Sequence, residues 1–238
     1  MKMTLRDAAR FLGLDEGTLE KLARKREIPA HQDGDRFRFN RVELLEWATA
    51  RDVPVKAELL EEPDTGDAAP LPGLADAVRL GGIHTGVRGD TQASVLRAVV
   101  DLLPNTIPPE RELLYRMLLA RETLGSTAMG QGIAIPHPRN PIVLRVEKPM
   151  VAVCFLERPV DFDALDAKPV HTALLLVSPS IRVHLHLLAL IATAIRDQAT
   201  RELLERRAPA PEILAAFGRV DEEIALRRAG RAGPGAAG

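Results

Sequence analysis

The residues best suited to chemistry in this 238-residue chain are a histidine and the glycine-rich segment before it. Neutral imidazole is a competent nucleophile, and consecutive backbone N–H groups in a glycine-rich turn can hold phosphate oxygens. Residues 125–137, GSTAMGQGIAIPH, therefore raise the hypothesis of a phosphoryl site at His137, with Ile133–Ile135 anchored at a sheet edge and Pro136 aiming the ring. The predicted phosphate-accommodating turn contains Gly125, Ser126, Thr127, Gly130 and Gly132.

A phosphohistidine also needs groups that offset and orient the added charge. A cation would neutralise the phosphoryl group, and a second polar group would orient the ring or contact a phosphoryl oxygen. Arg121 and the His-Leu-His segment at 184–186 are the nearest candidates. On a helix, His184 and His186 would point about 200° apart, so only one of them can face the site. Spacing alone does not choose between them.

Taken singly, these signals have simpler explanations, because a histidine after proline is more often structural and a Gly-Ser-Thr segment is more often a plain connection. For the other histidines and the cysteine, a structural role is the simpler explanation. His171 and Cys154 fall in predicted buried strands and are expected in the core. His31 and His84 have no second His or Cys at metal-ligand spacing, so we predict neither a metal site nor a cofactor.

A second candidate surface lies in the first 51 residues, where positive charge gathers on a helix and a hairpin. Asp15 can cap a helix that runs to about Arg26, and Asp33-Gly34 between two extended segments predicts the hairpin. A winged helix-turn-helix uses such a helix in the major groove and such a hairpin on phosphates. On charge alone, the solvated face of a small protein-binding module is the simpler explanation. The predicted DNA contacts are Thr18, Lys21, Arg24, Lys25, Arg36 and Arg38.

Length and composition favour two unequal domains, since 46% apolar residues suffice for a real core. The net charge of −1 means that any nucleic-acid role must come from local clustering of Lys and Arg. A single cysteine and the lack of a signal peptide or a bilayer-spanning apolar run lead us to expect a cytoplasmic protein without membrane insertion. We expect a domain at 1–51, an acidic Pro/Gly-containing linker at 52–73, a domain at 74–222 and a disordered tail at 223–238.

The second domain interleaves helices and strands, which predicts an α/β fold. In the first domain, Asn40 caps a third helix whose Val42, Leu44, Leu45 and Trp47 suit one buried face. The elements expected beyond the linker are helices at 91–103 and 109–122, strands at 150–156 and 170–177, and helices at 181–197, 200–206 and 211–217.

Three segments of the second domain carry a family resemblance. Residues 121–137 (RETLGSTAMGQGIAIPH), 159–170 (PVDFDALDAKPV) and 184–192 (HLHLLALIA) resemble the type-2 enzyme IIA domains of the bacterial phosphotransferase system, of the mannitol, fructose and nitrogen-regulatory kind. The resemblance extends from about Leu74 to Asp221. It implies a mixed α/β sheet flanked by helices.

The resemblance also implies roles for individual residues. His137 would accept a phosphoryl group from the phosphocarrier HPr or its nitrogen-branch relative, His184 would be the supporting histidine, and Arg121 would help to neutralise the phosphate. Ser126 and Thr127 would shape the loop. The domain would be a phosphoryl-transfer protein with a phosphohistidine intermediate, more regulatory than metabolic.

The rim of the site departs from the family pattern. Nitrogen-regulatory members generally have Gly after the active histidine, whereas Pro138, Arg139 and Asn140 follow it in this chain. Pro138 removes a backbone donor, and Arg139 can add positive charge beside the ring. Met129 stands at the mouth as an apolar contact for a partner. We expect donor affinity or partner choice to differ accordingly.

The first domain resembles the excisionase and MerR-like winged helix-turn-helix family over nearly its whole length. The resemblance includes the R-x-I-P-A step, the G-D-R-F-R-F hairpin and the closing helix. Gly17 lowers the helix propensity of the recognition helix by about 1 kcal/mol, and Glu16 and Glu20 place negative charge near the groove. We therefore expect a homodimer that reads two half-sites.

Three functions follow from these features. The first is a signalling protein in which phosphorylation of one domain controls DNA binding by the other, or binding to a regulatory protein target. The second is a sugar-specific enzyme IIA that passes phosphate to a permease subunit, although such a subunit has no evident use for a winged helix. The third is a binding module without phosphorylation, against which the presence of Arg121, His137 and His184 argues.

Overall fold

Two sheets organise the part of the chain that the computed structural model describes, residues 2–34, 36–51, 53, 70–104, 106–139 and 146–231. A three-stranded sheet belongs to an N-terminal unit (residues 2–51) and a four-stranded sheet to a C-terminal unit (residues 70–231). Most of the predicted linker at 52–73 lies outside the described residues.

Side-chain caps set the helix starts of the N-terminal unit. The Thr4 hydroxyl accepts a backbone hydrogen bond at the start of α1 (Leu5–Leu12), and the Asp15 carboxylate does the same for α2 (Glu16–Arg24). The predicted hairpin is confirmed by antiparallel pairing of its two strands. The other elements are β1 (Lys2–Met3), β2 (His31–Asp33), β3 (Arg36–Asn40) and α3 (Arg41–Ala50), and the strand order is β1-β3-β2.

The C-terminal unit alternates helices with strands along the chain. Its strands are β4 (Ile83–Val87), β5 (Ile133–Ala134), β6 (Met150–Val160) and β7 (Val170–Val177). Its helices are α4 (Leu74–Gly81), α5 (Gln92–Asp101), α6 (Pro108–Glu122), α7 (Ile181–Arg196), α8 (Gln198–Glu205) and α9 (Ala210–Arg231).

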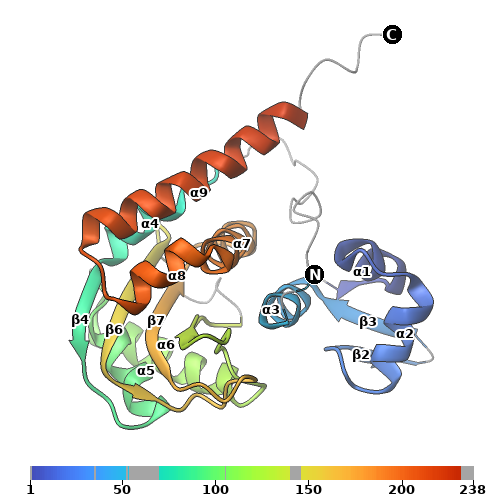
Figure 1. Cartoon of the computed structure of the whole chain (residues 1–238). Coiled ribbons are helices and arrows are strands. Elements are labelled where there is room, and N and C mark those ends of the chain that lie inside the picture. Colours follow the sequence, from blue (N-terminus) through green and yellow to red (C-terminus); the bar gives the residue numbers. More distant parts are fainter. Residues whose placement is uncertain are drawn as a thin grey trace.

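The sheet of the C-terminal unit is mixed, with strand order β4-β6-β7-β5. β6 and β7 pair antiparallel at its centre, while β4 runs parallel to β6 and β5 runs parallel to β7. The central strands are buried along most of their length because helices cover the sheet, as Figure 1 shows. The predicted α/β fold with a mixed sheet, flanking helices and a small N-terminal helix-turn-helix is confirmed.

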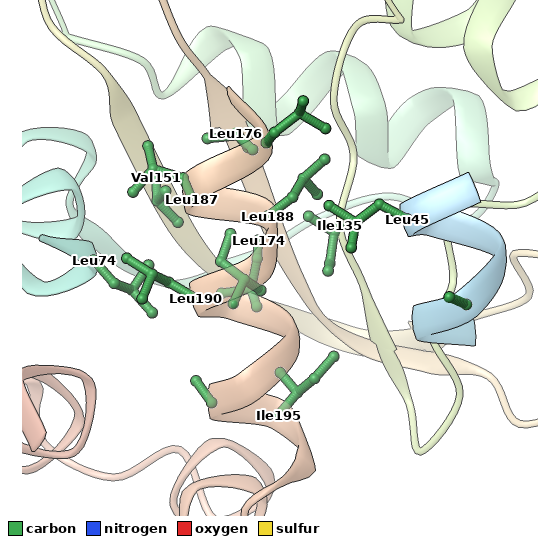
Figure 2. Close-up of a cluster of buried hydrophobic side chains, with 14 of the residues drawn as sticks. Leu45, Leu74, Ile135, Val151, Leu174, Leu176, Leu187, Leu188, Leu190 and Ile195 are labelled. Atoms are coloured by element: carbon green, nitrogen blue, oxygen red, sulfur yellow. The ribbon is translucent and has the colours of Figure 1, made fainter. Parts of the chain in front are cut away.

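Helix α3 packs between the two units. Leu44 is fully buried, and its neighbour Leu45 is 3% exposed although it projects about 100° away around the helix. The helix contacts α1 and β3 of its own unit and α7 of the C-terminal unit. Figure 2 shows Leu45 beside Ile135 and Leu188 of the C-terminal unit. Helix α3 therefore packs against the C-terminal unit as well, in addition to the single buried face expected from the sequence.

Helix α9 is longer than the sequence predicts. It runs through Val220 and Ile224, which pack on the core, and it continues to Arg231. The expectation of a disordered tail from residue 223 is therefore wrong as far as Arg231, and residues 232–238 lie outside the described part. The periodic apolar signal is weak after Phe217, so the continuation depends on a tertiary contact.

That tertiary contact is a helix cap supplied from far along the chain. The Asp221 carboxylate accepts hydrogen bonds from the backbone N–H groups of Leu74 (2.7 Å) and Ala75 (3.0 Å), at the start of α4. Gly73, the residue at the N-cap position, supplies no side-chain hydrogen bond. Asp221 therefore ties α9 to the helix that opens the C-terminal unit.

Replacing this cap is expected to destabilise the C-terminal unit. Asp221→Ala should lower the free energy of unfolding by about 1 kcal/mol, because two N–H groups at the start of α4 lose their acceptor. Urea unfolding of the full chain measures the change, with Glu222→Ala on the exposed side of the same helix as the control. Equal stability of the two variants would contradict the capping role.

Candidate functional site

His137 lies just beyond the edge strand β5, held by backbone pairing that continues past the strand. The Pro136 carbonyl accepts a hydrogen bond from the Leu176 N–H of β7 at 3.0 Å. The His137 Nδ1 atom lies 2.6 Å from the carbonyl oxygen of Ile135. The side chain is only 2% exposed. The ring is therefore fixed by its own strand.

The contact with Ile135 also selects the tautomer of His137. A carbonyl oxygen can only accept a hydrogen bond, so the proton of the neutral ring lies on Nδ1. Nε2 then carries the lone pair and is the nucleophilic nitrogen. The sequence alone did not indicate which ring nitrogen would react.

His184 is the member of the His-Leu-His segment that meets His137. Its ring centroid lies 5.2 Å from that of His137, with the two ring planes at 53°. His184 is fully buried, and its Nδ1 atom lies 3.1 Å from the Ser178 hydroxyl. His186 instead places Nε2 3.0 Å from the Pro72 carbonyl oxygen. The structure thus places the two rings differently, as helical spacing requires.

Arg121 reaches the same site from the last turn of α6. The side chain is 8% exposed, and its Nη1 atom donates to the Gly125 carbonyl at 2.7 Å. Both Arg121 and Gly125 line a cavity of about 540 Å³ that also contacts His137. A fixed guanidinium in the wall of this cavity can offset negative charge on a ligand.

The glycine-rich loop divides into two parts. Gly125, Ser126 and Thr127 line the cavity with His137, as the sequence suggested. Among the described residues, Gly130 and Gly132 lie outside the cavity wall, where they approach the side chains of Asp166 and His171. A side chain at position 132 would collide with the His171 ring, and its φ of 73° is in the left-handed region. These two glycines shape the backbone and do not face the cavity.

Several N–H groups of the loop are already bound within the protein. The N–H groups of Ala128, Met129 and Gln131 donate to the Ser126 hydroxyl, the Ile133 carbonyl and the Asp166 carboxylate. Those amides are not available to a phosphate. The loop is therefore mainly a turn stabilised by internal hydrogen bonds, and not the expected nest of consecutive N–H groups that would bind phosphate. Arg121 and His137 are then polar groups of the cavity wall that can meet a ligand, with His184 packed against His137.

Glu122 is a site residue that the sequence analysis missed. The Thr127 hydroxyl donates to its Oε1, and the Thr127 N–H (3.1 Å) and Gln92 side-chain N–H (2.8 Å) donate to Oε2. Burial raises its pKa above the usual range, opposed by the hydrogen bonds from Thr127 and by the charges of Arg121 and His137. A glutamate at a helix end is usually solvated, so no sequence signal marked it.

The predicted DNA contacts gather on the N-terminal unit, away from His137. Lys21 is exposed on α2, Lys25 directly after that helix, and Arg36 on β3. Two other members of the set have internal partners, since the Arg24 guanidinium pairs with Glu20 at 2.6 Å and the Thr18 hydroxyl donates to Asp15 at 2.6 Å. Arg38 is half-buried on β3. The exposed lysines and Arg36 are thus the best placed to meet phosphates.

Comparison with known proteins defines the class. The sequence model of the phosphoenolpyruvate-dependent sugar phosphotransferase system EIIA 2 family matches residues 80–219, and a helix-turn-helix domain model matches residues 3–52. The chain belongs to the type-2 EIIA family of the phosphotransferase system and carries an N-terminal helix-turn-helix domain. Both resemblances stated from the sequence are confirmed.

Individual relatives narrow the class further. A nitrogen regulatory protein of Pseudomonas aeruginosa is 39% identical over 131 residues, which make up 54% of this chain and 82% of that protein. One from Klebsiella oxytoca is 33% identical over 115 residues, 47% of this chain and 69% of that protein. The crystal structure of nitrogen regulatory protein IIA-Ntr from Neisseria meningitidis is similar, with a TM-score of 0.53 and 29% identity over 60% of this chain and 98% of that one.

In the described ranges, no helix is both long and apolar enough to cross a membrane. Over the same residues, no group of three or more His, Cys, Asp or Glu side chains could hold a metal ion. Burial raises the pKa of Cys154 to about 12, in keeping with its expected place in the core.

The buried carboxyl of Glu122 gives a prediction about pH. Because its folded-state pKa is raised above 4.5, its contribution to stability is fully present below that value and is lost as pH rises through the raised pKa. Glu122→Gln removes this titration. The stability of the variant relative to wild type should therefore increase with pH over this window, as measured by urea unfolding at a series of pH values.

A matched charge change separates this effect from a general loss of negative charge. Glu222→Gln alters an exposed carboxylate on α9 and serves as the control. A stability difference between wild type and Glu122→Gln that is the same at every pH would contradict the raised pKa.

Proposed function

We propose that this chain is a nitrogen-regulatory type of enzyme IIA protein of the cytoplasm that takes a phosphoryl group onto His137 Nε2 from an HPr-type phosphocarrier and couples that state to DNA binding. The observation that carries the proposal is the buried His137–His184 pair, with Nδ1 of His137 fixed on the Ile135 carbonyl. The names of the nitrogen regulatory relatives support the regulatory class.

The proposed transfer is balanced between two imidazole rings. The Nε2 lone pair of His137 attacks phosphorus while the donor's P–N bond breaks and its electron pair returns to the donor nitrogen. The donor ring keeps the proton on its other nitrogen and leaves neutral, and His137 keeps its proton on Nδ1. The Ile135 carbonyl stabilises the positive charge that develops on the His137 ring as the new N–P bond forms.

Arg121 and His184 serve the phosphoryl group in this proposal. The Arg121 guanidinium, held by the Gly125 carbonyl, offsets phosphoryl charge from the cavity wall. We assign the Ser178 hydroxyl, 3.1 Å from His184 Nδ1, as the donor of that hydrogen bond, so that the ring proton lies on Nε2 and can be donated to a phosphoryl oxygen. Glu122 is a positioning residue, because it acts through Thr127.

Labelling with phosphoenolpyruvate, enzyme I and HPr tests the site directly. The wild type should acquire acid-labile label and His137→Ala none. His184→Ala should be labelled more slowly by on the order of 10²–10³-fold, because one donor to the transferring group is lost. Initial rates of labelling measure the effect.

His186→Ala is the matched control for the second histidine, because it changes the same residue type two positions along α7. It should be labelled at close to the wild-type rate, since His186 bonds to Pro72 rather than facing His137. Undiminished labelling of His137→Ala would overturn the site. Onward transfer to a sugar-linked permease subunit, without any effect on DNA binding, would instead support the alternative of a transport component.

The proposed DNA contact rests on the exposed cations of α2 and β3. DNA affinity should fall with salt, with a slope of log K against log salt near −0.9 for each phosphate contacted. Lys21→Ala should weaken binding to all sequences and reduce the magnitude of that slope by about 1. Fluorescence anisotropy at several salt concentrations measures both, and sedimentation of the complex tests the expected homodimer.

Arg79→Ala provides the control for this experiment, because Arg79 is an exposed cation on α4 of the C-terminal unit that pairs with Asp76. It should leave the slope unchanged. An affinity that does not depend on salt would rule out phosphate contact by the N-terminal unit.

A further inference from the structure

The N-terminal unit supplies part of the wall of the His137 cavity. Glu43, Leu45 and Trp47 of α3 line this cavity together with His137 and Leu188 of the C-terminal unit. A protein donor must bring its own histidine ring close enough to share phosphorus with Nε2 of His137. His137 is almost completely buried in this arrangement, and α3 forms part of the wall of the cavity through which such a donor would approach.

An apolar contact holds α3 at the wall of this cavity. Leu45 lies against Ile135, the residue whose carbonyl fixes the His137 ring, and against Leu188 of α7 (Figure 2). Trp47 is fastened within its own unit, since its indole N–H donates to the Glu27 carbonyl at 2.7 Å. The helix therefore presents a fixed apolar surface to the rim of the site, and separating the units would expose Leu45 to water.

An ion pair joins the same two surfaces. Glu43 of α3 pairs with Arg139, two residues beyond His137, and its other carboxylate oxygen lies 3.0 Å from His31 Nε2. The Glu43 side chain is 16% exposed, so this pair is screened less than one at the open surface. Arg139 is part of the segment where the chain departs from its family's pattern, and its partner belongs to the added helix-turn-helix domain.

We propose that docking of α3 beside His137 is an autoinhibitory contact, which must open before a phosphocarrier reaches the ring and which a phosphoryl group on His137 weakens. This inference rests on the proposed function, because it concerns access to the same histidine. α2, with the exposed Lys21, lies on the side of the N-terminal unit away from α7 (Figure 1). The contact therefore covers the phosphorylation site and leaves the predicted DNA-reading helix uncovered.

The charge of a phosphoryl group predicts whether phosphorylation favours the docked or the undocked arrangement of α3. A phosphoryl group adds about −1.5 to −2 charges, and it would enter a cavity whose wall already contains Glu43. Repulsion of the Glu43 carboxylate and attraction of Arg139 toward the phosphoryl oxygens both oppose the Glu43–Arg139 pair. The phosphorylated chain is thus expected to favour the undocked arrangement.

Two phosphoryl donors of different size test the contact in the full chain. Phosphorylated HPr must dock on the face that α3 covers, whereas phosphoramidate is small enough for a cavity of about 540 Å³. Leu45→Asp and Glu43→Arg should speed labelling of His137 by HPr, about tenfold for each 1.4 kcal/mol of docking free energy lost. Because Glu43 and Leu45 also line the cavity that phosphoramidate enters, each HPr rate is divided by the phosphoramidate rate of the same variant, and this ratio should rise in both variants. Circular dichroism confirms that each variant is folded.

A charge exchange provides the internal control. Adding Arg139→Glu to Glu43→Arg restores an opposite-charge pair, so the double variant should fall back toward the wild-type rate with HPr once each rate is divided by that with phosphoramidate. Arg88→Glu, which breaks an exposed pair with Glu157 away from the cavity, should leave both rates unchanged.

The outcomes separate the inference from the proposed function. Equal HPr rates in wild type, Leu45→Asp and Glu43→Arg would overturn the inference while leaving phosphorylation of His137 intact. The same acceleration with both donors would also overturn it, because the variants would then have altered His137 itself. Failure of both donors to label His137 in every variant would overturn the proposed function, and labelling by phosphoramidate alone would overturn the HPr assignment together with the inference that depends on it.

The predicted undocking of α3 on phosphorylation of His137 is measured separately, as a change in the distance between the two units. Fluorescent dyes on Glu16→Cys in α2 and Glu222→Cys in α9 report the distance between the units, and Cys154 does not interfere because it is fully buried. Energy transfer should fall when phosphoramidate phosphorylates the chain, and it should not change in the His137→Ala background. Energy transfer that stays constant or rises on phosphorylation of His137 would overturn this part of the proposal.

Discussion

The hydrogen bond from His137 Nδ1 to the Ile135 carbonyl is the constraint on which the site depends. It needs Ile135 and Pro136 to continue the pairing of β5 with β7, which the Pro136–Leu176 hydrogen bond secures. It also leaves Nε2 as the nitrogen with a lone pair, on a ring whose centroid lies 5.2 Å from that of His184. A backbone group thus sets the chemistry of the side chain, and no second side chain is needed to choose the tautomer.

The same strand end connects the chemistry to the N-terminal unit. Ile135 contacts Leu45 of α3, and Arg139 pairs with Glu43 only two residues beyond the reactive ring. A change of charge on His137 therefore acts within a few residues of both contacts. Under the proposed function, this proximity gives phosphorylation of His137 a short physical route to the helix-turn-helix domain, without a conformational change passing through the sheet.

Local signals in the sequence were sufficient for much of the fold. The cap at Asp15 and the hairpin at Asp33-Gly34 are encoded by neighbouring residues, and the structure confirms both. β4 was missed because its sequence, Ile-His-Thr-Gly-Val, has no apolar run or clear alternation. The extension of α9 was missed because Asp221 finds its partners at the start of α4, about 150 residues earlier in the chain. Contacts of that kind leave no local pattern.

In the site too, some residues were predicted from local motifs and another depends on a tertiary contact. The motifs pointed to His137, His184 and Arg121, which the structure brings together, whereas Glu122 becomes a bracing residue only through burial against Thr127.

The most direct test of the account is the protonation state of the His137 ring in the unphosphorylated full chain, read from long-range ¹H–¹⁵N correlations of the imidazole nitrogens. His137→Ala identifies the signals. The account predicts a neutral ring with its proton on Nδ1 and an unprotonated Nε2. A proton on Nε2, with Nδ1 unprotonated, would contradict it.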